Sequence, residues 1–171
     1  GSEYLKVLHS CVRGTPPSLD LELERRLQAL LTAAARDGLV QSAHDCSDGG
    51  FAVALAECCF DTGGLGAEAD IGNAAGLASA SRIVATLFGE SASSVIVSVA
   101  PDAVAEIVER ASVASVPVRE IGKTGGARIQ IAMAGDLAVD LTVAEAEDLW
   151  ATAIERCFVQ SEPDSLLKIQ R

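Results

Sequence analysis

Aromatic residues are scarce in this chain, at 4% of 171 residues, with one Trp, one Tyr and four Phe. A hydrophobic core must therefore be built from aliphatic side chains, which are plentiful because 49% of the residues are hydrophobic. Apolar runs of about 18 residues, the length that spans a bilayer, are absent. The amino terminus also lacks the basic-then-apolar pattern of a secretion signal. The sequence thus predicts no membrane span and a cytoplasmic location.

Cysteine and histidine are too few and too irregularly spaced for the common metal and nucleophile sites. The five cysteines form no Cys-x-x-Cys pair, which argues against a disulfide framework or a zinc site. The only histidines, His9 and His44, form no recognisable glutaminase pair with a cysteine. His44 precedes Asp45 on an expected strand, where neighbours point to opposite faces, so we expect a structural role for it. We predict no catalytic residue, no metal site and buried thiols in a reducing compartment.

Positive charge is also in short supply, since 13 basic residues face 24 acidic ones and give a formal net charge of −11. This balance argues against nucleic acid or an anionic membrane surface as a partner. It leaves room for a locally positive pocket. The length and the hydrophobic content fit a single domain over residues 1–171.

The spacing of apolar residues and turn formers predicts helices mixed with strands. Helices are expected at 3–9, 18–37, 50–60, 78–85, after Pro101 and from Thr142 to about 157, and strands at 39–43, 65–71, 94–99, 116–121, 128–133 and 137–141. Ser18 is the expected N-cap of the long helix, and Thr142 with Glu145 fits a capping box. Glycine-containing turns join the last three strands into a meander. We predict an α+β fold with helices packed on a mixed, largely antiparallel sheet.

A polar elbow, Ser-Ala-His-Asp-Cys-Ser-Asp-Gly-Gly, separates a short apolar strand from an alanine-rich helix. Its two glycines permit positive φ or a close backbone approach, and the first turn of the following helix favours negative charge. Its two aspartates repel a bare phosphate unless a metal or an arginine intervenes. The alternative is that Ser47 or Asp48 only caps the helix. The candidate substrate- or phosphate-binding residues here are Asp45, Ser47, Asp48, Gly49 and Gly50.

Five stretches in a fixed order carry a resemblance to a known family. They are Ser2-Glu3-Tyr4-Leu5, Arg13-Gly14-Thr15-Pro16-Pro17, the elbow with Ala52-Val53-Ala54-Leu55-Ala56-Glu57, Leu87-Phe88-Gly89-Glu90-Ser91, and Ile121-Gly122-Lys123-Thr124-Gly125-Gly126. Through them, residues 2–150 resemble the last domain of the synthetase chain of phosphoribosylformylglycinamidine synthase, the amidotransferase of purine biosynthesis. The same domain type occurs in aminoimidazole ribonucleotide synthetase and related enzymes. The resemblance implies the same α+β fold.

The resemblance implies a ligase that converts formylglycinamide ribonucleotide, glutamine-derived ammonia and ATP to the amidine. ATP and Mg²⁺ are implied to bind mainly in a preceding domain, so this chain alone is expected to be inactive and to hold no cofactor tightly. Glu90 and Ser91 match the start of a Glu-Ser-Gln triplet that contacts the ribonucleotide in the family's first repeat. Here the third residue is Ala92, which lacks the amide, and the chain resembles the second, auxiliary repeat. Glu90 and Ser91 are candidate ligand-facing residues, with a structural loop as the alternative.

The chain begins at Gly1 without Met, and we expect a domain excised from the C-terminal end of a larger synthetase, with a frayed tail at 160–171. The implied partners are the preceding synthetase domains and a glutaminase subunit or domain. The alternative function is a non-catalytic scaffold of that enzyme or of a related ATP-dependent synthetase. Ala52, Val53 and Ala56 cannot all face one core from a single helix, so an exposed apolar surface and self-association are expected.

Overall fold

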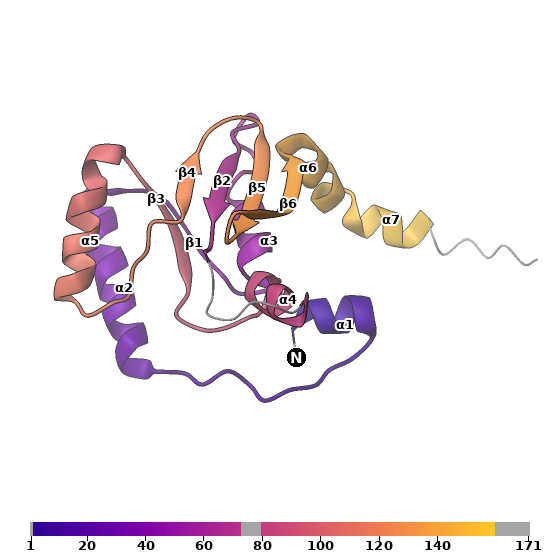
Figure 1. The fold of residues 1–171 in the computed structure, drawn as a ribbon, viewed down its shortest axis with the longest axis horizontal. Coiled ribbons are helices and arrows are strands. Elements are labelled where there is room, and N and C mark those ends of the chain that lie inside the picture. Colours follow the sequence, from indigo (N-terminus) through magenta and orange to yellow (C-terminus); the bar gives the residue numbers. More distant parts are fainter. Residues whose placement is uncertain (1, 73–79, 160–171) are drawn as a thin grey trace, which may run out of the picture.

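The computed structural model describes residues 2–72 and 80–159, which form an α+β arrangement of helices and two sheets (Figure 1). The predicted frayed tail at 160–171 lies outside the described residues. The elements in chain order are α1 (Glu3–His9), α2 (Leu21–Arg36), β1 (Val40–Asp45), α3 (Gly50–Glu57), β2 (Ala67–Asp70), α4 (Ala80–Phe88), β3 (Val95–Val99), the 3-10 turn η1 (Pro101–Ala103), α5 (Val104–Val113), β4 (Gly122–Thr124), β5 (Arg128–Met133), β6 (Asp136–Thr142), α6 (Val143–Ala151) and α7 (Ala153–Val159).

The strands form two sheets. One is the antiparallel pair β1-β3, and the other has the order β4-β2-β5-β6. In the larger sheet β2 and β5 are parallel, whereas β2 with β4 and β5 with β6 are antiparallel. The predicted fold class, with mixed and largely antiparallel strands, is confirmed, although the strands divide between two sheets.

Two separate apolar cores hold these layers together. The larger core joins α3, α4 and α6 to the four-stranded sheet around Ile129, Ile131 and Val143, which are almost fully buried. The smaller core lies between α2 and α5, which run side by side next to β1 and β3, and it contains Leu27 and Ala111 (Figure 1). Most of the buried side chains in both cores are aliphatic, as the scarcity of aromatic residues predicts, and Phe51, Phe60 and Phe88 pack against the larger core.

The expected strand at 116–121 is wrong, because the strand in this region, β4, begins only at Gly122. Val116 instead packs into the smaller core, and Pro117 has no N–H to give to a ladder. The expected meander is also wrong, since β4 pairs with β2 and not with β5. Gly122 makes that pairing possible, because a Cβ atom there would lie only 1.8 Å from the carbonyl oxygen of Glu68.

The helix ends differ from the expectations at three places. Asp20, not Ser18, caps α2, with its Oδ1 accepting from two first-turn N–H groups at 3.0 Å each. The helix expected at 78–85 is α4, which spans Ala80–Phe88; residues 78 and 79 lie outside the described residues. The single helix expected after Thr142 is divided into α6 and α7 at Thr152, whose hydroxyl donates to the carbonyl of Asp148 at 2.6 Å.

The small apolar residues of α3 do not form the exposed surface that the sequence predicts. Ala52 is buried in the larger core, Ala56 packs against it, and Val53 is half-buried. The exposed large apolar side chains lie elsewhere, and those on and after α1 and on α5, α6 and α7 are joined by others before and on α2, before β2, after α5 and on β6. Within the described ranges, no helix combines the length and the apolar character needed to cross a membrane.

Candidate functional site

The elbow between β1 and α3 is a tight backbone turn built on two glycines. Gly49 has φ 81° and Gly50 has φ 72°, which confirms the predicted positive φ. The N–H of Gly50 donates to the carbonyl of Ser47 at 3.1 Å. A Cβ atom on Gly50 would lie 2.8 Å from the carbonyl oxygen of Gly89 and 2.9 Å from the Cα of Phe88. Only glycine therefore lets the elbow lie against the end of α4.

The predicted cap of α3 by Ser47 or Asp48 is wrong. The N-cap is Gly49, no side chain of the elbow accepts a first-turn N–H, and both Ser47 and Asp48 are exposed. The N–H of the N-cap residue itself is bonded by a distant part of the chain, since Oε1 of Glu90 accepts from the N–H of Gly49 at 3.1 Å. A carboxylate near this N-terminus also complements the helix dipole.

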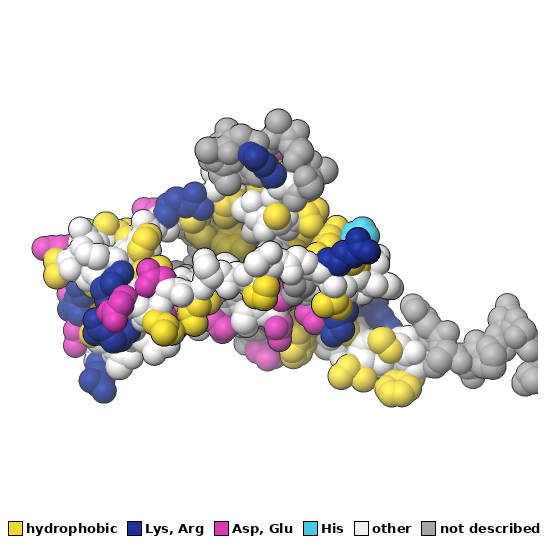
Figure 2. Space-filling model, turned by 90° about the horizontal axis from the view of Figure 1, so that it is seen from below, with side chains coloured by type: hydrophobic (Ala, Val, Ile, Leu, Met, Phe, Trp, Pro, Cys, Tyr) yellow, Lys and Arg dark blue, Asp and Glu magenta, His cyan; other side chains and the backbone are white. Residues whose placement is uncertain are grey.

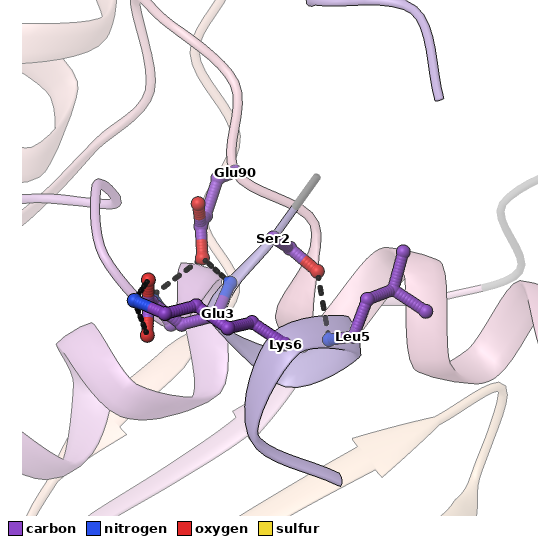
Figure 3. Close-up of polar contacts among 6 residues, drawn as sticks. Ser2, Glu3, Leu5, Lys6 and Glu90 are labelled. Atoms are coloured by element: carbon purple, nitrogen blue, oxygen red, sulfur yellow. Dashed lines mark hydrogen bonds and ion pairs between the residues drawn. The ribbon is translucent and has the colours of Figure 1, made fainter. Parts of the chain in front are cut away.

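Glu90 also holds α1 in place. The same Oε1 accepts from the N–H of Glu3 at 2.7 Å, and Figure 3 shows the carboxylate directed at the start of α1. At the N-cap of α1, Ser2 Oγ accepts from the N–H of Leu5 at 3.4 Å. The ring of Tyr4 stacks on Phe88 with a centroid distance of 5.0 Å. One carboxylate oxygen thus joins α1, the elbow and the loop after α4, a role that no local sequence signal predicts.

The other candidate residues do not converge on one point. Asp45 and Ser91 are exposed, as are Ser47 and Asp48. Cys46, between them, is buried, and burial together with the nearby Cys58 and Asp45 raises its pKa to about 11. A thiol with so high a pKa stays protonated near neutral pH and is a poor nucleophile. The structure brings together Gly49, Gly50 and Glu90 but leaves the remaining candidates at the surface.

His44 connects β1 with α3. Its Nε2 lies 3.4 Å from Oε2 of Glu57, and its Nδ1 lies 2.7 Å from the backbone carbonyl oxygen of Asp45. The carboxylate of Asp45 is farther away, with Oδ1 at 4.0 Å from Nδ1. Both ring nitrogens thus face oxygen atoms of the chain itself, which agrees with a structural role.

The residues of the elbow do not fit a nucleotide phosphate. The N–H of Gly49, which an anion would need, is already bonded to Glu90. Asp45 and Asp48 add negative charge at the surface of the same turn. In residues 2–72 and 80–159, no three His, Cys, Asp or Glu side chains are grouped so that they could hold a metal ion.

The five cysteines are all free thiols in the structure. Cys46 and Cys59 are buried, as expected. Cys11 and Cys58 are only half-buried, and Cys157 on α7 is exposed. The expectation of buried thiols is therefore wrong for Cys157, because α7 lies outside both cores.

Comparison with known proteins agrees with the resemblance carried by the five sequence stretches. Residues 1–133 match the family described as AIR synthase related protein, C-terminal domain. The chain is 44% identical over 154 residues to the phosphoribosylformylglycinamidine synthase subunit PurL of Thermomicrobium roseum, covering 90% of this chain and 20% of that protein. It therefore spans about a fifth of the length of the curated relatives that it matches.

Solved structures confirm the fold. T. maritima PurL complexed with ATP aligns with a TM-score of 0.62 and 21% identity over 75% of this chain and 22% of that one. T. maritima PurL complexed with FGAR aligns with a TM-score of 0.59 and 21% identity over 72% of this chain and 21% of that one. With the family match over most of its length, the chain belongs to the AIR synthase-related proteins, as their C-terminal domain.

Proposed function

We propose that this chain is the C-terminal domain of the synthetase subunit of phosphoribosylformylglycinamidine synthase. The whole enzyme would use ATP and glutamine-derived ammonia to convert formylglycinamide ribonucleotide to formylglycinamidine ribonucleotide in the cytoplasm. The observation that carries this proposal is the 44% identity to a PurL subunit over 154 residues. That similarity favours this enzyme over the other synthetases that contain the same type of domain.

Within the enzyme, we assign this domain a supporting role. ATP and Mg²⁺ would bind mainly in the part of the enzyme that precedes it, since the chain has no phosphate-binding loop in its sequence and its elbow is occupied by Glu90. The ATP complex of T. maritima PurL agrees with ATP use by the intact enzyme. Glu90, Gly49 and Gly50 would hold the elbow and α1 in the shape that the neighbouring domains contact. Asp45, Ser47, Asp48 and Ser91, which are exposed, remain the candidates for contact with a ligand.

A chimera tests the proposed function. In it, this chain replaces the matching fifth of the Thermomicrobium roseum PurL subunit, and amidine formation from formylglycinamide ribonucleotide, ATP, Mg²⁺ and ammonia is measured. We expect activity within about tenfold of the parent, a difference of roughly 1.4 kcal/mol. The parent truncated at the same boundary is the control and should be inactive. A folded chimera with no more activity than the truncated parent would refute the proposal.

The 171-residue chain alone should neither hydrolyse ATP nor form the amidine. Steady-state assays with the purified chain, ATP, Mg²⁺, ammonia and the ribonucleotide should give only background rates. Turnover that rises in proportion to the chain concentration and survives further purification would show that the domain has its own active site.

The proposed partners are the preceding synthetase domains and a glutaminase subunit or domain. In their absence, we expect the chain to associate with itself through its exposed apolar side chains near α1, namely Val7, Leu8 and Val12. The interface should bury more than about 1,000 Å², the usual minimum for a specific contact. Sedimentation velocity over a wide concentration range checks this, and a strict monomer throughout would contradict it.

A further inference from the structure

Helix α7 leaves the body of the molecule at the end of α6, on the side opposite α2 and α5 (Figure 1). The six side chains described for it, residues 153–158, are all exposed. In the described part of the chain, neither apolar core contains a residue of α7. Isolated helices shorter than about 12 residues are marginal in water, so a seven-residue helix in this position gains little from local interactions alone.

Exposed apolar side chains continue along α6 and α7 beyond the larger core. Ala146 on α6 is buried in the larger core, Trp150 lies near the end of α6, and Ile154 and Phe158 lie one turn apart on α7. Their exposed fractions are 59%, 76% and 73%. We call these three residues the C-terminal stripe. Figure 2 shows hydrophobic side chains uncovered at this end of the molecule, beyond the acidic and basic groups of the central surface.

The C-terminal stripe is anchored to the folded domain at its first residue. The ring of Trp150 lies against that of Phe60, with a centroid distance of 5.6 Å, and Phe60 packs on the larger core. The stripe is thus a continuation of the core and presents a fixed aromatic side chain at its start. Aromatic residues so placed often dominate binding energy at interfaces.

The two helices that carry the stripe are acidic. Between residues 143 and 158 there are four carboxylates and one guanidinium. That guanidinium, of Arg156, is paired with Asp148 at 2.8 Å. Glu155 is exposed and lies next to Ile154. A surface of this kind attracts an apolar segment that is bordered by positive charge and repels one bordered by negative charge.

We propose that the C-terminal stripe is a docking surface for an amphipathic helix of a partner polypeptide whose apolar face is bordered by lysine or arginine. The apolar face of that helix covers Trp150, Ile154 and Phe158, and its cations pair with carboxylates such as Glu155. This is the helix-in-groove mode of recognition, in which side chains at steps of three and four residues act as anchors. The inference does not depend on the proposed enzyme, and the stripe lies beyond residue 133, where the family match ends.

A second copy of this chain is the less suitable occupant. Its net charge is −11, so two copies that meet at acidic helices repel each other. The N-terminal helix α1, which also exposes Val7 and Leu8, contains one Lys and one Glu and cannot supply an excess of positive charge. A partner with a basic border satisfies both the apolar and the electrostatic requirement.

The sole tryptophan of the chain is Trp150, so intrinsic fluorescence reports directly on the stripe. The 171-residue chain is titrated with a helical peptide of about 18 residues, long enough to be helical, that carries leucine on one face and lysine on the other. We expect a saturable blue shift of the emission, which weakens as the salt concentration rises. A peptide with the same leucine face and glutamate in place of lysine should bind at least about tenfold more weakly.

Two pairs of variants locate the binding site. Ile154→Ser should weaken binding of the lysine peptide at least about tenfold, whereas Val113→Ser, at an 83% exposed position of α5, should leave it unchanged. Glu155→Lys should weaken binding, and Glu109→Lys on α5 should not. Circular dichroism checks that all four variants stay folded, as expected for exposed positions.

Three outcomes would overturn the proposal. The first is that both peptides bind equally, which would indicate apolar adhesion without charge selection. The second is that Ile154→Ser and Val113→Ser have the same effect. The third is that the lysine peptide does not bind while the chain forms dimers that Ile154→Ser abolishes in sedimentation velocity, which would assign the stripe to a second copy.

Discussion

The carboxylate of Glu90 and the backbone N–H of Gly49, 41 positions apart in the chain, are joined by a hydrogen bond of 3.1 Å. The same oxygen atom accepts from Glu3, which is 87 positions away from Glu90. Replacing Glu90 by Ala leaves both half-buried N–H groups without their acceptor. We expect Glu90→Ala to lower the free energy of unfolding by about 1–3 kcal/mol.

Urea denaturation measures this loss, and Glu90→Gln should lose less, because the amide oxygen still accepts a hydrogen bond. Glu109→Ala on the exposed face of α5 serves as the control and should change stability little. Hydrogen exchange in α1 should speed up selectively in Glu90→Ala. An unchanged stability and an unchanged exchange rate in α1 would show that Glu90 does not hold the helix.

Gly50 and Gly135 share a positive φ but differ in their surroundings. A Cβ on Gly50, at φ 72°, would meet the backbone of Phe88 and Gly89 below 3 Å, whereas one on Gly135, at φ 87°, would meet nothing within 4 Å. Gly135→Ala should therefore lose only about 1 kcal/mol of stability through backbone strain. Gly50→Ala should lose more than about 3 kcal/mol, because the clash adds to the strain. Thermal unfolding of the two variants compares them, and equal losses would mean that the elbow can move away from α4.

The acid sensitivity of the domain should depend on Glu145. Hydrogen bonds from the backbone N–H and then the hydroxyl of Thr142 lower the pKa of this carboxyl. A group whose pKa is lower in the folded than in the unfolded state stabilises the fold above its unfolded pKa, and this stabilisation is lost as the pH falls through the folded value. Stability should therefore fall below about pH 4–5, the ordinary range of a glutamate.

The variant Glu145→Gln should show a smaller part of this decrease than the parent when unfolding is measured at pH 7 and at pH 3. Glu109→Gln, at an exposed position, is the matched control and should follow the parent. If Glu145→Gln follows the parent over the whole range, other carboxyls determine the acid sensitivity. The best placed is Asp140, whose pKa is lowered chiefly by a hydrogen bond from Arg128.

The thiols should differ widely in reactivity. Cys157 is exposed on α7, whereas Cys46 is buried in the elbow with a pKa of about 11. Iodoacetamide reacts with the thiolate, so near neutral pH Cys157 should be alkylated quickly and Cys46 only slowly. Peptide mass spectrometry against time measures both rates, and in concentrated urea the difference should disappear. Fast alkylation of Cys46 in the folded chain would mean that the elbow opens readily.

Local features of the fold could be predicted from the sequence, and contacts between distant residues could not. The capping box of Thr142 and Glu145 depends on residues three apart, and the structure contains it. The positive φ of Gly49 and Gly50 follows from their position between a strand and a helix. The prediction of a strand at 116–121 was wrong, although the alternating apolar residues of this segment fit a strand. Val116 packs instead into the core between α2 and α5.

The same limit applies to the candidate site. The elbow could be found because its glycines and aspartates all lie between Asp45 and Gly50 in the sequence. The acceptor for the N–H of Gly49 could not be found from the sequence. Ser47 and Asp48 are the nearest capping residues along the chain, and Glu90 is far from both. Local capping rules consider only side chains close in sequence to the first turn of the helix. They cannot include an acceptor that the tertiary fold brings to the same place.

The bond between Glu90 and Glu3 has a consequence for the order of events during protein synthesis. A ribosome releases α1 and the elbow well before it releases residue 90, because 87 positions separate the two bonded residues. Helix α1, seven residues long, is therefore left without this tertiary anchor while the 87 positions up to Glu90 are made. A chaperone that binds short apolar segments would find Val7 and Leu8 available throughout that interval.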